Sequence, residues 1–293
     1  WQIYRWTDSP TALGLVGLAN FLQYIVFALQ AGHLADTVNR RRLIQTTLAG
    51  SAGVSVALAL VSQWPWLAGD WAPLRAVNGG LLWVARFFEG AAHVNAAGFE
   101  RPAVAVIFLL LLLGASIRTL GAPARASLVP LILPRERLAN AITWSSSTFE
   151  LTAMVGPALA GFLIHYTSYA TVYAFDAVMG LTMAVLMLRI HYREPERKPE
   201  PRTWRTLGAG ARFIWRNKEI LAASGLDLFA VLLGGAVALL PIYAKDILHA
   251  GPTELGFLRA APGVGAILMA LWLSRFPIRD PLNLAELHPT CLV

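Results

Sequence analysis

The sequence of 293 residues has little cysteine and little charge. Its one cysteine, Cys291, excludes a disulfide within the chain. Charged residues make up 14% of the chain, whereas they make up about 25% of an ordinary soluble domain. Hydrophobic residues make up 56%, and the mean hydropathy is +0.55. This balance excludes an ordinary soluble domain and indicates an integral membrane protein.

Sequence patterns of catalysis and metal binding are also lacking. The sequence contains no P-loop, no Gly-x-Ser-x-Gly turn and no His-Glu-x-x-His pair, and its histidines show no metal-ligand spacing. A net charge of +7 would suit nucleic acid, but the basic residues occur in short stretches between apolar runs. We therefore expect neither an enzyme nor a metal, a cofactor or a nucleic-acid partner.

Seven apolar segments are long enough to cross a bilayer, which takes about 20 residues. They predict an all-α membrane protein that is a bundle of about seven transmembrane helices, with spans near residues 11–33, 43–64, 103–127, 139–164, 168–190, 220–244 and 254–275.

Two connections between these spans are long. Residues 65–102 carry charges and prolines that make a further span improbable, and Leu81–Phe88 within them has the pattern of an amphipathic helix at the membrane interface. Residues 191–219 are first charged and proline-rich, and then form a basic amphipathic stretch from Trp204 to Lys218. We interpret the chain as an N-terminal half, a linker with a surface helix, the start of a C-terminal half and a polar tail: 1–190, 191–219, 220–275 and 276–293.

The distribution of basic residues orients the spans. Sixteen Lys and Arg residues lie on the side of the Arg40–Arg42 turn and the central linker, and five lie on the other side. Because cytoplasmic loops carry the excess of basic residues, the Arg40–Arg42 turn is expected in the cytoplasm.

A short internal repeat suggests two related halves. Pro10–Gly14 introduces the first span and Pro252–Gly256 introduces the last, at an offset of 242 residues. Each segment starts an apolar run toward the cytoplasmic side. Parallel repeats of this kind are one known design of transporters.

The turn between the first two spans resembles the signature loop of the major facilitator superfamily, Gly-x-x-x-Asp-[Arg/Lys]-x-Gly-[Arg/Lys]-[Arg/Lys]. The chain departs from this pattern at Thr37, where a basic residue is usual, and at Asn39, where glycine is usual. Asn tolerates left-handed backbone angles, so the turn is expected to keep its shape. The chain supplies the glycine, the acid and the final basic pair of the pattern: Gly32, Asp36, Arg40 and Arg41.

Two further stretches resemble exporters of this family. Gly156, Pro157 and Gly161 match the Gly-Pro-x-x-x-Gly motif of the fifth helix in antiporters, and 118–141 is similar to the fourth helix and following loop of bacterial drug and siderophore exporters. The resemblance implies that the chain holds family helices two to eight and is truncated at both ends. The tail after Arg275 reads as a fragment end or a shifted frame, or else as a functional short form.

Ionisable residues inside spans are candidate site residues, because a charge near the bilayer centre costs at least about 2.5–3.5 kcal/mol. Glu150 lies near the middle of its span, where burial would raise its pKa toward neutral, and we interpret it as the proton carrier. Arg118 is interpreted as its partner or as a charge on the substrate side, and Asp227 and Asp176 as weaker candidates. Each could instead be a structural ion pair or a polar contact between helices.

The resemblance implies a secondary transporter that exports small molecules, of the drug or siderophore class, by alternating access and in exchange for protons. It implies a monomer in the plasma (inner) membrane of a bacterium, with the lipid bilayer, protons and a small-molecule substrate as partners. The motif at Asp36 would then form a reversible latch that favours the outward-facing state, or would serve only to set topology. The alternative is a truncated or regulatory membrane fragment that does not transport by itself.

Overall fold

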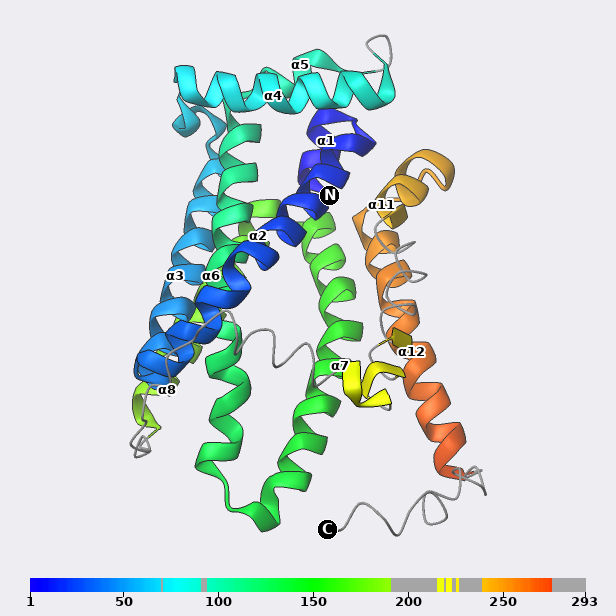
Figure 1. The fold of residues 1–293 in the computed structure, drawn as a ribbon. Coiled ribbons are helices and arrows are strands. Elements are labelled where there is room, and N and C mark those ends of the chain that lie inside the picture. The colour runs from blue at the N-terminus through cyan, green and yellow to red at the C-terminus, as the bar shows by residue number, and fades with distance from the viewer. Residues whose placement is uncertain are drawn as a thin grey trace.

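A computed structural model of the chain describes residues 1–69, 71–90, 94–190, 215–218, 220–222, 225–226 and 239–275. These residues are helical and contain no strand (Figure 1). Five helices among them are long and apolar enough to cross a membrane, at Pro10–Ala28, Arg40–Gln63, Pro102–Ile132, Glu136–Tyr166 and Tyr169–Arg189.

The predicted all-α membrane architecture is confirmed. Six of the seven predicted spans coincide with long helices, and most of the seventh, at 220–244, lies outside the described residues, as does most of the predicted linker. The six helices are α2 (Pro10–Thr37), α3 (Arg40–Gln63), α6 (Pro102–Ile132), α7 (Arg135–Tyr166), α8 (Tyr169–Arg189) and α12 (Pro252–Arg275). Shorter elements are α1 (Gln2–Thr7), η1 (Pro65–Ala68), α4 (Ala72–Glu89), α5 (Ala96–Phe99), α11 (Leu240–Ile242) and η3 (Tyr243–Ile247).

The long helices pack in two groups. Helix α3 packs on α8, and α6 packs on both α2 and α3, whereas α7 packs mainly on α12 and stands apart from the first group (Figure 1). Apolar side chains fill the first group near both of its ends. One cluster includes Ile3, Leu58, Phe99 and Ile107, and the other includes Leu43, Ile44, Ala124 and Leu128.

The turn between α2 and α3 differs from expectation at Asn39. Its φ is −56°, so it does not adopt the left-handed angle that the sequence suggested. Its side chain instead accepts a hydrogen bond from the backbone N–H of Arg42 at 3.1 Å and caps the start of α3. Asn is a preferred residue at this position because its side-chain oxygen satisfies a free N–H of the first turn. The replacement of the family's glycine by Asn39 is therefore explained by helix capping.

Helix α4 lies across one end of the bundle, roughly perpendicular to the long helices (Figure 1). It covers the predicted amphipathic segment Leu81–Phe88, whose place at the membrane interface stays a prediction. Asn78 and Ala85 are buried against the bundle, whereas Trp83 and Phe87 are 68% and 72% exposed and stack on each other at 5.9 Å between ring centroids. We call this end of the bundle the α4 end. The opposite end, which carries the turn between α2 and α3, is the Arg40 end.

Helix α4 is attached to α2 through Glu89. The Glu89 carboxylate accepts hydrogen bonds from the Ser9 hydroxyl and from the backbone N–H of Thr11, both at 2.6 Å. Ser9 in turn accepts from the N–H of Ala12 and caps α2. A carboxylate at a helix N-terminus is stabilised by free N–H groups and by the helix dipole. Glu89 thus joins α4 to the first turn of α2.

Replacing Glu89 with alanine is expected to lower the free energy of unfolding by about 1 kcal/mol, because the first turn of α2 loses its acceptor. Thermal unfolding of the purified protein in detergent measures this. Arg86→Ala, an exposed position on the same helix, is the control and should change little. Equal melting temperatures for the two variants would show that the cap contributes nothing.

Candidate functional site

Two side-chain pairs join the beginning of the chain to its last described segment at the α4 end. The Tyr4 hydroxyl of α1 donates a hydrogen bond to the Asp246 carboxylate of η3. Lys245, the neighbour of Asp246, forms a salt bridge with Asp8, which directly follows α1. The Lys245 ammonium also lies 4.9 Å from the centre of the Tyr4 ring, within the range of a cation–π contact. These four residues, Tyr4, Asp8, Lys245 and Asp246, are called the α4-end latch.

The two pairs of the latch differ in burial. Tyr4 is 1% exposed, whereas the side chains of Lys245 and Asp8 are 29% and 58% exposed. Burial, together with the hydrogen bond to Asp246, raises the pKa of the Tyr4 hydroxyl above its usual range. Tyr4 therefore remains protonated, and remains a donor, at every pH below its ordinary pKa of about 10. The Tyr4–Asp246 bond is the better shielded pair, and the salt bridge is partly screened by solvent.

Sequence reasoning missed the latch, although the sequence held a signal for it. Tyr4 and Asp246 are separated by 242 residues, the same offset that relates Pro10–Gly14 to Pro252–Gly256. The two residues thus occupy equivalent positions in the repeat. In two halves related by a two-fold axis, equivalent residues meet where they lie on that axis, and the contact is consistent with such an arrangement.

Helices α7 and α12 approach closely at small residues. A Cβ added to Gly161 would lie 2.3 Å from the backbone oxygen of Pro252, and one added to Gly256 would lie 2.6 Å from the backbone oxygen of Pro157. A Cβ on Gly263 would lie 2.8 Å from the Cβ of Met154. Small residues of this kind let two helix backbones touch. We call this contact the α7–α12 seam.

The three residues of the Gly-Pro-x-x-x-Gly motif do not lie equally close to the seam. Gly161 and the carbonyl of Pro157 are in it, but a Cβ on Gly156 would meet no atom within 4 Å among the described residues. Pro157 lies inside α7, which continues through it to Tyr166. The partner of the motif is the second copy of the repeat, Pro252–Gly256, at the start of α12.

The predicted gating motif lies at the Arg40 end. Asp36 is exposed near the end of α2, Gly32 is half-buried one turn earlier, and Arg40 begins α3. Arg41 donates from Nη2 to the backbone oxygen of Leu188 at 2.5 Å, near the end of α8. A cation at a helix C-terminus is stabilised by free carbonyl groups. Arg41 thus ties α3 to α8 within the first helix group, and the role of the motif as a latch stays a prediction.

The candidate charges inside the spans do not pair with each other. Glu150 on α7 and Arg118 on α6 are both exposed, so the burial expected for Glu150 is not found, and among the described residues no ion pair joins the two side chains. The Arg118 carbonyl accepts a hydrogen bond from Arg125 at 2.7 Å. Asp176 accepts a hydrogen bond from Ser55, as a polar contact between α8 and α3. Asp227 lies outside the described residues, and the proton-coupling roles stay predictions.

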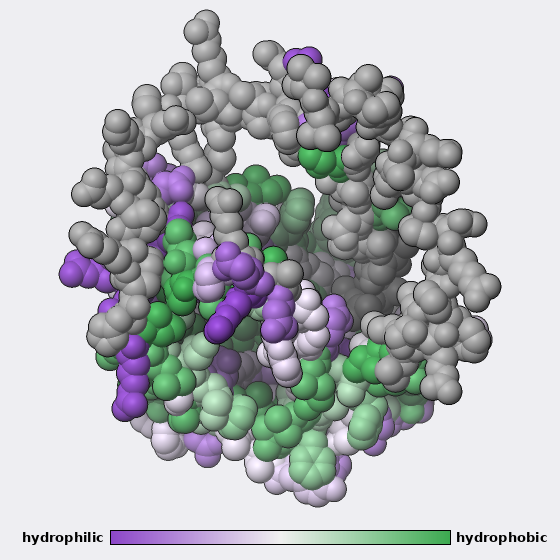
Figure 2. Space-filling view, turned by 90° about the horizontal axis from the view of Figure 1, so that it is seen from below, coloured by the Kyte–Doolittle hydropathy of each residue, from purple (hydrophilic) through white to green (hydrophobic). Residues whose placement is uncertain are grey.

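Seen from the Arg40 end, the described residues present both apolar and polar side chains (Figure 2). The segment of α7 that surrounds Glu150 is exposed throughout, including Trp144 and Phe149. At the other end, the latch and the seam bring the halves into contact. In the described part of the chain, no group of three or more His, Cys, Asp or Glu residues is arranged to hold a metal ion.

Comparisons with known proteins agree with the motifs. A family model described as Major Facilitator Superfamily matches residues 5–287. The chain is similar to Macrolide efflux protein A of Streptococcus pyogenes, with 23% identity over 92% of this chain and 59% of that protein. It is similar to a protein of the same name from Enterococcus faecalis, with 23% identity over 89% of this chain and 71% of that protein.

A third relative is the Multidrug efflux pump Tap of Mycolicibacterium fortuitum, with 26% identity over 92% of this chain and 60% of that protein. The chain thus spans about three fifths of the length of the first of these relatives.

Proposed function

Because the chain belongs to the major facilitator superfamily, we propose that it works in a proton-coupled exporter of small molecules. The family is one of transporters and not of enzymes. Relatives named for macrolide and multidrug efflux support an export direction and a substrate of the drug class. A siderophore remains the other candidate substrate, and the resemblance of residues 118–141 is what favours it.

The observation that carries the proposal is the asymmetry of the two ends. At the α4 end, the latch and the α7–α12 seam hold segments from the two halves together. Toward the Arg40 end, by contrast, residues 142–153 of α7 are exposed. Alternating access requires a binding site that is open to one side and closed to the other, with weak contacts that can break. The arrangement fits one of the two states of such a cycle.

The orientation follows from charge. With the basic Arg40–Arg42 turn on the cytoplasmic side of a bacterial plasma membrane, the exposed part of α7 is reached from the cytoplasm and the latch closes the outer end. An exporter loads its substrate in this state. We propose that the transporter works as a monomer. Its outer end would open when the latch and the part of the α7–α12 seam nearest the α4 end separate.

Glu150 is proposed to carry the proton. It lies on α7, the helix that packs on α12, and its side chain is exposed. Arg118 and Asp227 are the further candidates for binding the proton or the substrate. A charged carboxylate favours water, whereas a protonated one can be buried against other helices at a lower cost. That difference is what can couple proton uptake to movement of α7 against the first helix group.

Replacing Glu150 with glutamine is expected to reduce proton-driven export to the background of cells without the transporter, because the side chain can no longer titrate. Accumulation of a macrolide is measured in cells that express the complete gene product containing this chain, with and without dissipation of the proton gradient. Glu136→Gln, at an exposed acid in the first turn of the same helix, is the control. Full export by Glu150→Gln would exclude Glu150 as the proton carrier.

The alternative of a membrane fragment that does not transport is tested in the same experiment. The 293-residue chain is expressed by itself beside the complete gene product, at matched abundance in the membrane. Export by the complete product alone supports the alternative for this chain. Failure of both to move any drug-class solute in proteoliposomes under a proton gradient contradicts the proposed function.

A further inference from the structure

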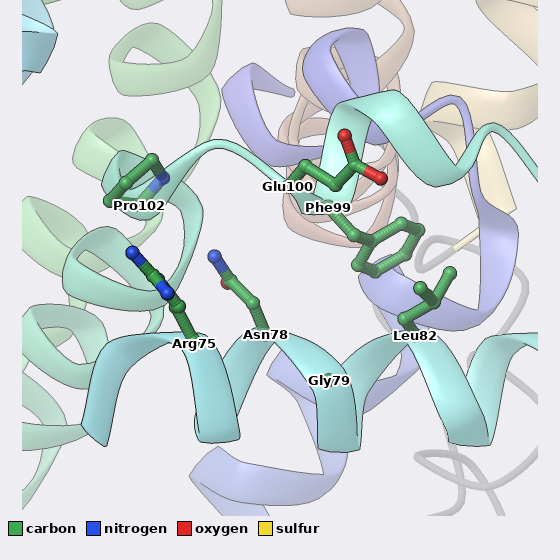
Figure 3. Close-up of a pocket in the computed structure, with 7 residues that line it drawn as sticks. All are labelled: Arg75, Asn78, Gly79, Leu82, Phe99, Glu100 and Pro102. Carbon is green, nitrogen blue, oxygen red and sulfur yellow. The ribbon is translucent and has the colours of Figure 1, made fainter. Parts of the chain in front are cut away.

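A cavity of about 360 Å³ lies at the α4 end, between α4 and the segment that joins α5 to α6 (Figure 3). Its volume is in the range of small-ligand sites. It belongs to the connection at 65–102, outside the motifs that identify the family, and the proposed transport mechanism makes no use of it. The lining residues are Arg75, Asn78, Gly79, Leu82, Phe99, Glu100 and Pro102.

Asn78 is the residue that points to a ligand. Its side chain is only 6% exposed, and its Nδ2 donates to the backbone oxygen of Arg101 at 2.9 Å. Its Oδ1 is buried, and no described residue donates to it. Figure 3 shows the amide directed from α4 toward the segment that contains Pro102. Buried amide oxygens in proteins nearly always accept a hydrogen bond, so the site is built to receive a donor.

The walls of the cavity carry one charge of each sign. Arg75 rises from α4 beside Asn78, and Glu100 lies at the end of α5, with its exposed carboxylate above Phe99 (Figure 3). Leu82 and Phe99 supply an apolar surface between α4 and α5. Paired walls of opposite charge favour a zwitterion over a simple anion or cation, because each charged group of the ligand meets a complementary partner.

A second cavity of about 410 Å³ adjoins the first and shares Pro102 with it. Arg101 adds a cation there, and Trp6 and Trp66 add aromatic surface. Trp side chains of this kind are enriched where protein meets the polar headgroups of a membrane. Helix α4 crosses the ends of the long helices (Figure 1), which is the level at which headgroups lie.

We propose that these two cavities bind a phosphoethanolamine group, carried by a membrane phospholipid or present as the free phosphate ester. The phosphate contacts Arg75 and Arg101, the ammonium donates to Asn78 Oδ1 and contacts Glu100, and the apolar part lies against Leu82. A primary ammonium supplies three N–H donors, whereas a choline headgroup has the same charges and no N–H. The unpaired oxygen of Asn78 therefore selects ethanolamine over choline.

The test compares these two headgroups on the unaltered protein. The complete gene product is extracted from vesicles of equal phosphatidylethanolamine, phosphatidylcholine and phosphatidylglycerol content, and retained lipids are identified by native mass spectrometry. Phosphatidylethanolamine is expected to be retained about tenfold over phosphatidylcholine, the ratio for one charge-assisted hydrogen bond. Equal retention of the two lipids would overturn the proposal, since a water molecule would then suffice for Asn78.

Variants separate this site from other lipid contacts. Asn78→Leu and Glu100→Gln are each expected to remove the preference for phosphatidylethanolamine, so that the two lipids are retained about equally. Arg86→Gln, on the same helix but outside both cavities, is the matched control and should keep the preference. If Asn78→Leu fails to fold, the proposal is still tested by Glu100→Gln, which is at an exposed position. The headgroup comparison on the unaltered protein tests it as well.

A soluble arm identifies the source of the ligand. Free phosphoethanolamine is titrated against protein stripped of lipid, and phosphocholine is titrated in parallel. Binding of free phosphoethanolamine with an affinity equal to that of the lipid supports the site with a soluble ester as its source, and binding of the lipid alone supports the membrane as its source. Binding of neither, or loss of the preference in Arg86→Gln as well, would overturn the assignment. None of these outcomes depends on transport, so failure here leaves the proposed exporter function untouched.

Discussion

Replacing Gly161 with valine is expected to abolish export, whereas the same replacement at Gly156 is expected to leave most of it. A side chain at Gly161 would overlap the backbone of Pro252, at 2.3 Å from its oxygen. Backbone cannot give way as the end of a flexible side chain can, so α7 and α12 must separate. Overpacking of this kind costs about 1–3 kcal/mol and occasionally more. Gly156 faces no described atom within 4 Å, and its replacement should cost under about 1 kcal/mol.

Two measurements check this result. Thermal unfolding of the purified variants reports the cost to packing, and macrolide accumulation in cells reports export. The comparison of the two variants is informative because the Gly-Pro-x-x-x-Gly motif by itself does not distinguish its two glycines. Equal effects at Gly156 and Gly161 would contradict the α7–α12 seam and would favour a role for the motif in the flexibility of α7 itself.

Removing the Tyr4 hydroxyl is expected to shift the protein about tenfold toward a state that is open at the α4 end. A buried hydrogen bond to a charged group contributes about 1.5–3 kcal/mol, and about 1.4 kcal/mol corresponds to a tenfold change in population. Lys245→Ala should have the smaller effect, because its salt bridge to Asp8 is partly exposed and such pairs contribute about 1 kcal/mol or less. The two changes together should shift the equilibrium further than either alone.

Distances between spin labels at the exposed positions Arg5 and Leu248 measure the opening of this end, with Cys291 replaced by serine. Tyr243→Phe is the matched control, because Tyr243 is an exposed tyrosine in the same π-helical turn as Asp246. A distance distribution in Tyr4→Phe identical to that in Tyr243→Phe would show that the latch does not hold the end closed.

The pairing of residues in the latch shows the limit of sequence reasoning. The repeat is visible from Pro10–Gly14 and Pro252–Gly256, because both segments begin a span and have similar local sequence requirements. It predicted two related halves, and it did not predict that Tyr4 would meet Asp246. A contact across 242 residues depends on how the two halves are docked, and docking leaves no periodic signal in either segment. The same holds for Glu89, whose acceptor role depends on where α4 crosses α2.

The turn at Asn39 shows a related limit. The departure from glycine suggests a left-handed backbone at this position, whereas the structure uses Asn39 as a helix cap with a φ of −56°. Both explanations suit asparagine, because its short side chain serves either purpose. Only the geometry of the chain on either side distinguishes them.

The sequence by itself determined the membrane class, the positions of six long helices and the family. These properties are local: they depend on the length and apolarity of a segment, or on residues within a few turns of one another. The tertiary structure alone decided which glycine of the motif is in contact, which charges pair and where Asn78 is left without a donor. Those features depend on the approach of segments distant in sequence, which is set by the packing of whole helices.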